Sequence, residues 1–415
     1  MLGWELPPLY GGGIGMVCYE MIKELSAKGI PVTYIMPLGP DGNFTSPYAN
    51  VIIAENHFLG KKVRPNIVNV PAFFSAYQSP EEYEEAYENF ILKGKNNNRN
   101  YRSELYGKHL FIEVDLFAKR LYNMANQFDF DVIHSHDWMT FPAAIGIADR
   151  TGKPLIVHVH NTIYDRYLGN ASKHERDIEY NGLARADKII AISNYVKNMI
   201  IDKYGIDPNK ISVVHNAKNT YMTNEVKEKY MINIKDKKII LFTGRITIQK
   251  GPEYFVYAAN KVLEKRKDVI FIMAGDGDML NRMINLTAQL GIAKYFIFSG
   301  WYNMEQAPSL YNSADCFVMP SVSEPFGIVP LEAMANMAPC IISKQSGCSE
   351  VLNHVLKVDF WNIDEMADKI IAILSYSKLN HQLKIYGKKE VDNLTWDKSV
   401  DKLLDVYQDS INMKK

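Results

Sequence analysis

Short apolar runs alternate with helix-like stretches along almost the whole chain, and this alternation limits the possible folds more than any other feature of the sequence. The runs are rich in Val, Ile and Phe at consecutive positions, which is typical of parallel strands covered on both faces. Strands that alternate with helices of ~10–15 residues predict βαβ units and a doubly wound α/β fold. The predicted strands are residues 32–36, 131–136, 155–160, 188–193, 211–216, 238–244, 269–275, 295–300, 315–320 and 340–344.

The strands fall into two sets, separated by a polar and charged segment at residues 216–238 that lacks a strand pattern. The chain has 415 residues, and a length of this order suits two domains of about 200 residues each. We therefore predict a Rossmann-like domain over residues 1–218, a second one over 219–395, and a C-terminal helix over 396–415 that crosses back to the first domain. Residues 60–105 are polar, aromatic and rich in Asn, and we interpret them as an insertion in the first domain.

Charge and cysteine content argue against several kinds of protein. Lys+Arg and Asp+Glu both total 47, so no overall field favours nucleic acid as a partner, and an anionic ligand must be held by local groups. The four cysteines form no CxxC pair, which indicates a reducing compartment and predicts a cytoplasmic protein. We find no signal peptide and no transmembrane segment, which leaves peripheral contact with a membrane open. The short stretch before the first glycine turn indicates a true start a few codons upstream.

Residues with chemical potential cluster at the carboxyl ends of the predicted strands, where open α/β sheets bind ligands. In SEPFGIVPLEAMA, Glu324 precedes Pro325, where we expect a helix to start, and Glu332 follows about two turns along. The helix dipole favours negative charge there, and each carboxylate can accept hydrogen bonds from sugar hydroxyls. A capping carboxylate and a surface glutamate are the alternative interpretation.

Two cations follow the strand predicted at residues 238–244. Arg245 and Lys250 stand in FTGRITIQKGPEYF, and Gly251 and Pro252 then open a helix. A forked guanidinium and an ammonium that face one pocket suit a diphosphate. The alternative is a pair of solvated cations near a loop.

A glycine loop precedes the first predicted helix. Gly12, Gly13 and Gly15 would let backbone N–H groups approach an anion at the helix N-terminus. The loop departs from the dinucleotide fingerprint, because Cys18 stands where the third glycine of GxGxxG would fall. A tight strand–helix turn without a ligand explains the glycines equally well.

Histidines end two strands of the first set. His134 and His136 fall on one face of their strand, and His158 and His160 share a face of the next one. No cysteine is nearby and the histidines lack helical spacing, so we predict no metal site. We interpret His134 and His158 as packed strand residues, and expect a polar role at the edge of a cleft for His160 and Asp137.

Taken together, these segments resemble the retaining glycosyltransferases with two facing Rossmann-like domains (the GT-B fold), in particular the family-4 and glycogen-synthase-like group. The resemblance covers nearly the whole chain and is carried by GWELPPLYGGGIG, HSHDW, VHVHNTIYD, ISNYVKNMI, FTGRITIQKG, AGDGD and SEPFGIVPLEAMA. The last segment matches the EX7E signature of the family with Glu324 and Glu332.

The resemblance implies a role for each matched residue. Glu324 would bind hydroxyls of the donor sugar, Glu332 would hold the ribose, and Arg245 and Lys250 would bind the diphosphate and stabilise the leaving group. His160 matches the histidine of the family that lies near the C6 hydroxyl and the anomeric carbon, and domain closure would bring it to the sugar. The donor-binding residues implied in this way are Gly12, Gly13, Gly15, Arg245, Lys250, Phe326, Gly327, Ile328 and Glu332.

The resemblance also implies a reaction, which is the retaining transfer of a hexose, foremost glucose, from a nucleotide diphosphate sugar. ADP- or UDP-glucose is the expected donor, and no cofactor or metal is expected. The acceptor is an α-glucan in one interpretation, and a lipid, a small molecule or another polysaccharide in the other.

The sequence departs from the family pattern at two places, and other kinds of protein stay in competition. VVHNAKN replaces the usual Asn-Gly turn, and SKQSGCSEVL has Ser346 and Gly347 where relatives often carry two glycines, with Glu350 keeping the acidic position. A glycoside hydrolase would use the two glutamates but leaves Arg245 and Lys250 unexplained. A non-catalytic protein that binds nucleotide sugars is the alternative of another kind.

Overall fold

Buried runs of branched and aromatic residues form parallel strands in the computed structural model, which describes residues 1–7, 13–37, 46–54, 110–167, 172–219, 234, 237–302 and 306–414. All ten predicted strands are present, so the predicted α/β class is confirmed. The sequence missed two short strands, β2 (Asn50–Ile53) and β12 (Leu356–Val358). The predicted insertion at residues 60–105 lies outside the described residues, as do residues 220–233, 235 and 236 of the predicted linker.

The first half of the chain contains two groups of parallel strands. β1 (Thr33–Met36) pairs with β2, and a four-stranded sheet has the order β3-β4-β5-β6. Leu2 bridges to Ile35 of β1 and to Ser135 of β3, so it lies between the two groups. The strands of the four-stranded sheet are β3 (Ile133–His136), β4 (Leu155–Val159), β5 (Lys188–Ala191) and β6 (Ile211–Val213).

The second half forms one six-stranded parallel sheet with the order β12-β11-β10-β7-β8-β9. The chain builds outward from β7 through β8 to β9, then returns to the other side of β7 and builds outward from β10. The strand order therefore reverses between β7 and β10. Besides β12, the strands are β7 (Lys238–Thr243), β8 (Val269–Ala274), β9 (Phe296–Gly300), β10 (Cys316–Met319) and β11 (Cys340–Ser343).

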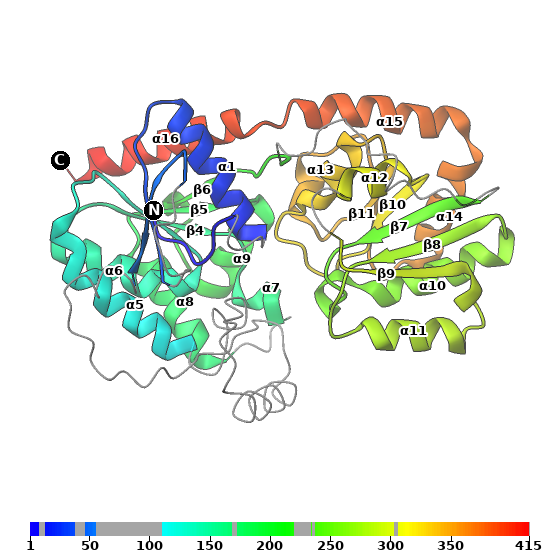
Figure 1. The fold of residues 1–415 in the computed structure, drawn as a ribbon, viewed down its shortest axis with the longest axis horizontal. Helices are drawn as coiled ribbons and strands as arrows, with labels where there is room; N and C mark the ends of the chain where they lie inside the picture. The colour runs from blue at the N-terminus through cyan, green and yellow to red at the C-terminus, as the bar shows by residue number, and fades with distance from the viewer. Residues whose placement is uncertain are drawn as a thin grey trace.

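Helices connect the strands and cover the sheets (Figure 1). In the first half they are α1 (Gly13–Ala27), α5 (Leu110–Met124), α6 (Phe141–Thr151), α7 (Ile163–Tyr167), α8 (Lys173–Arg185) and α9 (Asn194–Tyr204), with the 3-10 turns η1 (Ala125–Gln127), η2 (Trp138–Thr140) and η3 (Pro208–Lys210). In the second half they are α10 (Pro252–Lys265), α11 (Leu280–Gln289), α12 (Ala307–Asn312), α13 (Ile328–Ala335) and α14 (Ile363–Ser375), with η5 (Ile248–Lys250), η6 (Ala293–Tyr295) and η7 (Gly347–Glu350).

The last two helices, α15 (Ser377–Asp392) and α16 (Trp396–Met413), run from the second sheet back to the first (Figure 1). Val400 and Leu403 of α16 are buried against Val17 and Met21 of α1. The helix that follows the second sheet thus packs on the first half of the chain. None of the described helices is long and apolar enough to cross a bilayer.

Candidate active site

The reversal of strand order between β7 and β10 places two loops side by side at the carboxyl edge of the second sheet. Such a switch point is where open α/β sheets bind ligands. The loop after β7 carries Arg245 and Lys250, and the loop after β10 carries Glu324. The topology therefore brings the loop of Arg245 and Lys250 next to the loop of Glu324, although Lys250 and Glu324 are 74 positions apart in the sequence.

Lys250 and Glu324 contact each other directly. The Lys250 ammonium lies 2.5 Å from Oε2 of Glu324, and the Ser321 hydroxyl donates to the same oxygen at 3.2 Å. Glu324 is only 7% exposed and the Lys250 side chain 20%. An ammonium and a carboxylate thus lie together at a site with little solvent exposure, where the electrostatic attraction between two charges is stronger than in water.

Gly251 allows the loop after β7 to approach the loop after β10 closely. Its φ is +63°, and a Cβ at this position would lie 2.2 Å from the carbonyl oxygen of Pro320. The residue ends η5 and precedes Pro252, the first residue of α10, so the predicted helix start is confirmed.

The helix after Glu324 begins later than the sequence predicted. Pro325 was expected at the helix start, but α13 begins at Ile328, and Gly327 precedes it with a φ of +96°. A helix cannot include this left-handed residue, so Glu332 is the fifth residue of α13 rather than two turns along. Phe326, Gly327 and Ile328 form the corner between Glu324 and the helix, and Phe326 is buried.

Glu332 belongs to α13 and is 6% exposed. Its carboxylate accepts hydrogen bonds from Nδ2 of Asn219 at 2.7 Å and from the Tyr311 hydroxyl at 3.1 Å. Asn219 belongs to the segment VVHNAKN, whose role the sequence left open, and no local signal identified it as a partner of Glu332.

The loop after β11 holds the backbone of Glu324. The Glu324 N–H donates to the carbonyl of Gln345 at 3.0 Å, and the Gly347 N–H donates to the Glu324 carbonyl at 2.9 Å. A Cβ on Gly347 would lie 2.2 Å from the Pro325 carbonyl oxygen. Glycine is therefore required at this one position of the Ser346–Gly347 departure.

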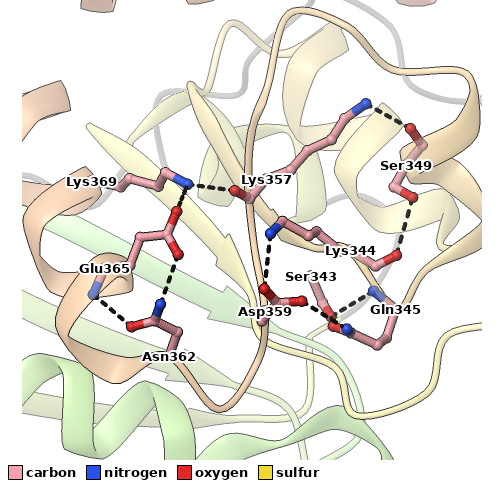
Figure 2. Close-up of polar contacts among 9 residues, drawn as sticks. All are labelled: Ser343, Lys344, Gln345, Ser349, Lys357, Asp359, Asn362, Glu365 and Lys369. Carbon is pink, nitrogen blue, oxygen red and sulfur yellow. Dashed lines mark hydrogen bonds and ion pairs between the residues drawn. The ribbon is translucent and has the colours of Figure 1, made fainter.

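Figure 2 shows the polar contacts that brace this loop from the other side. Asp359 accepts hydrogen bonds from the Lys344 ammonium at 2.8 Å and from Nε2 of Gln345 at 3.0 Å. The Lys357 ammonium donates to the Ser349 carbonyl at 2.7 Å. These contacts fix the loop that positions Glu324.

His160 follows β4 in the first half of the chain and is 5% exposed. Its Nε2 shares a hydrogen bond with Nδ1 of His136 at 2.8 Å, and its backbone N–H donates to Oδ1 of Asp137 at 2.8 Å. Burial lowers the pKa of His160 to about 3, so its imidazole is neutral at physiological pH. The ring is thus oriented as a neutral hydrogen-bonding group.

Asp137 supports His160 from a strained backbone. Its φ is +58°, which is rare for a residue with a side chain. Burial raises the pKa of Asp137 to about 6, although Arg166 lies 4.0 Å away and opposes this shift. The strain and the raised pKa are consistent with the polar role expected for this residue.

His134 and His158 are fully buried, in agreement with their interpretation as packed strand residues. Nε2 of His134 shares a hydrogen bond with Nδ1 of His158 at 3.2 Å, and Nδ1 of His134 shares one with the Tyr407 hydroxyl of α16 at 2.7 Å. Nitrogens of His134, His136 and His158 lie within 4.8 Å of one another, a spacing that a metal ion could use after adjustment. The rings of His134 and His158 stack with an interplanar angle of 11°. The absence of a metal ion at these histidines stays a prediction.

The glycine loop is only partly described, since Gly12 lies outside the described residues. α1 begins at Gly13, so Gly13 and Gly15 belong to its first turn instead of preceding it. The Gly15 N–H donates to Oε1 of Glu5 at 3.1 Å. A carboxylate of the chain therefore occupies one N–H group that the sequence offered to a phosphate.

The two halves of the site face each other. α7, which follows His160, lies against η5, which carries Lys250. Residues from both halves can therefore contact one ligand, and the set of a buried carboxylate, cations and a neutral imidazole suits a sugar diphosphate.

Comparisons with known proteins identify the family of the chain. A family model described as Glycosyltransferase Family 4 matches residues 11–220, and one described as Glycosyl transferases group 1 matches residues 224–390. An uncharacterized glycosyltransferase of Methanocaldococcus jannaschii is 29% identical over 434 residues, which cover 100% of this chain and 98% of the relative.

Two further relatives act on different acceptors according to their names. The UDP-Gal:alpha-D-GlcNAc-diphosphoundecaprenol alpha-1,3-galactosyltransferase of Escherichia coli is 26% identical over 70% of this chain and 78% of its own length. The glycogen synthase of Mycobacterium tuberculosis is 24% identical over 85% of this chain and 79% of its own length. Among solved structures, the sucrose-phosphate synthase of Thermosynechococcus elongatus superposes with a TM-score of 0.70 at 18% identity, over 96% of this chain and 94% of that one. This likeness shows the GT-B fold, as predicted.

Proposed function

Because the chain belongs to glycosyltransferase family 4, we propose that it transfers a hexose, foremost glucose, from a nucleotide diphosphate sugar to an acceptor hydroxyl with retention of the anomeric configuration. The observation that carries this proposal is the contact of Lys250 with Glu324 at the switch point of the second sheet. A glycoside hydrolase has no use for cations at this position, whereas a sugar diphosphate needs a positive group at the phosphates and an acceptor group at the sugar.

The donor would lie along the carboxyl edge of the second sheet. Arg245 and Lys250 would contact the diphosphate, Glu324 would accept hydrogen bonds from sugar hydroxyls, and Glu332 would accept them from the ribose. The corner at Phe326, Gly327 and Ile328 would face the donor beside the N-terminus of α13, where the dipole favours the phosphates. His160 would contact the sugar from the other half of the site as a neutral hydrogen-bonding group.

In the reaction, the bond between the anomeric carbon and the diphosphate oxygen breaks, and negative charge accumulates on the leaving diphosphate. Arg245 and Lys250 offset that charge in a site from which most water is excluded. The acceptor oxygen forms its bond to the anomeric carbon on the face that the diphosphate leaves, and its proton passes to a phosphate oxygen of the leaving group. We propose that the two cations make a metal ion unnecessary.

The experiment that tests this proposal is the release of nucleotide diphosphate from ADP-, UDP- and GDP-sugars, with and without glycogen or maltooligosaccharide. Release from ADP- or UDP-glucose that rises with glucan identifies an α-glucan as acceptor. Release that a lipid-linked sugar stimulates instead keeps the transferase and moves the acceptor to the lipid class. No release from any donor overturns the proposal and favours a binding protein. Nuclear magnetic resonance of the product reports the anomeric configuration, and activity that persists in EDTA supports a metal-independent reaction.

A further inference from the structure

The residues on both sides of Glu324 are held by the other half of the chain. The Ser323 hydroxyl donates to Oδ1 of Asp165 at 2.7 Å, and the Tyr195 hydroxyl lies 2.9 Å from Ser323 Oγ. Because the single Ser323 proton is directed at Asp165, we assign Tyr195 as the donor of this second bond. On the other side, the Ser193 hydroxyl donates to the Pro325 carbonyl at 2.6 Å. Asp165, Ser193 and Tyr195 belong to the part of the chain that carries His160.

Asp165 divides its two oxygens between two tasks. Oδ2 accepts the hydroxyl of Thr162 at 2.7 Å and its N–H at 3.3 Å, while the Asp165 N–H donates back to the Thr162 hydroxyl at 3.2 Å. This reciprocal arrangement caps α7. Oδ1 has no part in the cap and instead reaches Ser323, so the two tasks can be separated by substitution.

Tyr195 is held at two points. Its hydroxyl donates to Ser323, and its backbone N–H donates to Oε1 of Glu350 at 2.6 Å. Oε2 of Glu350 accepts from the Asn194 N–H at 2.9 Å and lies 3.1 Å from Nε2 of His215. Glu350 ends the same loop whose Gln345 and Gly347 hold the Glu324 backbone. Both loops that position Glu324 are thus tied to α9.

We propose that Asp165 and Tyr195 are positioning residues that, through Ser323, set the place of the Glu324 carboxylate relative to His160. The inference rests on the proposed function, because it concerns the same site. Hydrogen bonds that form a chain to a buried carboxylate are strong and directional. The backbone at Ser323 is also held, since the Val322 N–H donates to the carbonyl of Gln249 at 2.9 Å and the Ser323 N–H donates to the same oxygen at 3.4 Å, beside Lys250. Ser323 is therefore tied to its own half through its backbone and to the other half through its hydroxyl.

The test uses Ser323→Ala, which removes the contacts of the Ser323 hydroxyl with Asp165 and Tyr195 and leaves the cap of α7 intact. Tyr195→Phe removes one donor, and the double variant tests whether the two act together. Ser410→Ala is the matched control, because Ser410 is a fully buried serine whose hydroxyl donates only within α16, to the Val406 carbonyl. We expect kcat to fall about tenfold in each single variant and no further in the double variant.

Binding of nucleotide diphosphate in the absence of acceptor should stay within about twofold of the wild type, because the nucleotide contacts the second half of the chain. A merely structural role would instead lower nucleotide affinity and kcat together. Unchanged kcat in Ser323→Ala, or losses that add in the double variant, would overturn the inference.

Hydrogen exchange separates failure of this inference from failure of the proposed function. If the wild-type protein transfers no sugar, the amides of Glu324, Gly347 and Tyr195 still report the contact, since all three are hydrogen-bonded. Faster exchange of these amides in Ser323→Ala, with no change in Ser410→Ala, supports the coupling of the two halves. Unchanged exchange overturns it, whether or not the protein is a transferase.

Discussion

Replacing Lys250 with alanine removes the ammonium that lies 2.5 Å from the Glu324 carboxylate. Two effects of different size follow. In the free protein, breaking a fully buried ion pair costs about 3–5 kcal/mol. The Lys250 side chain is 20% exposed, so water can enter the space it leaves and reduce the loss to about 1–2 kcal/mol. For a domain of this size such a loss lowers Tm by ~2–8 °C, and the protein stays folded at 25 °C.

The effect on catalysis should be larger. The ammonium faces the position where the diphosphate gains charge in the transition state, and removing one preorganised donor of this kind lowers kcat about 100- to 1000-fold. That factor corresponds to ~3–4 kcal/mol of transition-state stabilisation. The assay is the initial rate of nucleotide diphosphate release at saturating donor, with a circular dichroism melt of the same preparation.

Lys238→Ala is the matched control. Its ammonium also contacts a carboxylate, Oδ1 of Asp315 at 3.0 Å, but it stands at the other end of β7. We expect kcat of this variant to equal that of the wild type within about twofold. A folded Lys250→Ala protein that keeps more than about half of the wild-type kcat would refute the assignment of Lys250 to the diphosphate.

Four further predictions follow from the described contacts. Glu324→Gln keeps the size of the side chain but removes its charge, so kcat should fall about 100-fold or more while a melt shows a folded protein. Asp137 has a pKa raised to about 6, and its carboxylate accepts the His160 N–H, so kcat/KM should fall as pH drops below about 6 and the acid limb should vanish in Asp137→Asn. The raised pKa means that the folded state favours protonated Asp137, so the stabilising contribution of this proton is present at low pH and lost as pH rises through about 6. The change in Tm caused by Asp137→Asn should therefore be more favourable at pH 8 than at pH 4. Leu403 of α16 is fully buried against α1, and Leu403→Ala should lower the free energy of unfolding by about 3 kcal/mol in a urea titration, whereas alanine at the exposed Lys402 should change it by less than about 0.5 kcal/mol.

The strands could be predicted because strands that are buried on both faces have continuous runs of Val, Ile and Phe in the sequence. β2 and β12 were missed because they are short edge strands, and Leu356–Val358 offers only three residues with a lysine in the middle. The pairing of the Lys250 loop with the Glu324 loop followed from one rule, that ligands bind at the carboxyl ends of strands where the order reverses. The sequence showed the residues at the strand ends, and the strand order made them neighbours.

The start of α13 could not be predicted by the same reasoning. Pro325 favours a helix start, but Gly327 adopts a left-handed conformation that excludes it from a helix. Glycine adopts positive and negative φ values about equally readily, so the sequence does not show which one occurs at Gly327. Asn219 is a comparable case, because its contact with Glu332 joins residues 113 positions apart.

The contacts between the two halves of the site are harder to predict from the sequence than the residues of each half. His160 and Glu324 each follow a strand of their own sheet, so local patterns identify both. Ser323 precedes Glu324, and its hydroxyl contacts Asp165 of the other half. In the sequence it is only a serine before a glutamate, whose hydroxyl could equally have capped a turn. We therefore expect that a chimera that exchanges the first half of the chain would retain Arg245, Lys250 and Glu324 and still misplace Glu324, unless the new first half also carried Asp165 and Tyr195 at the same places.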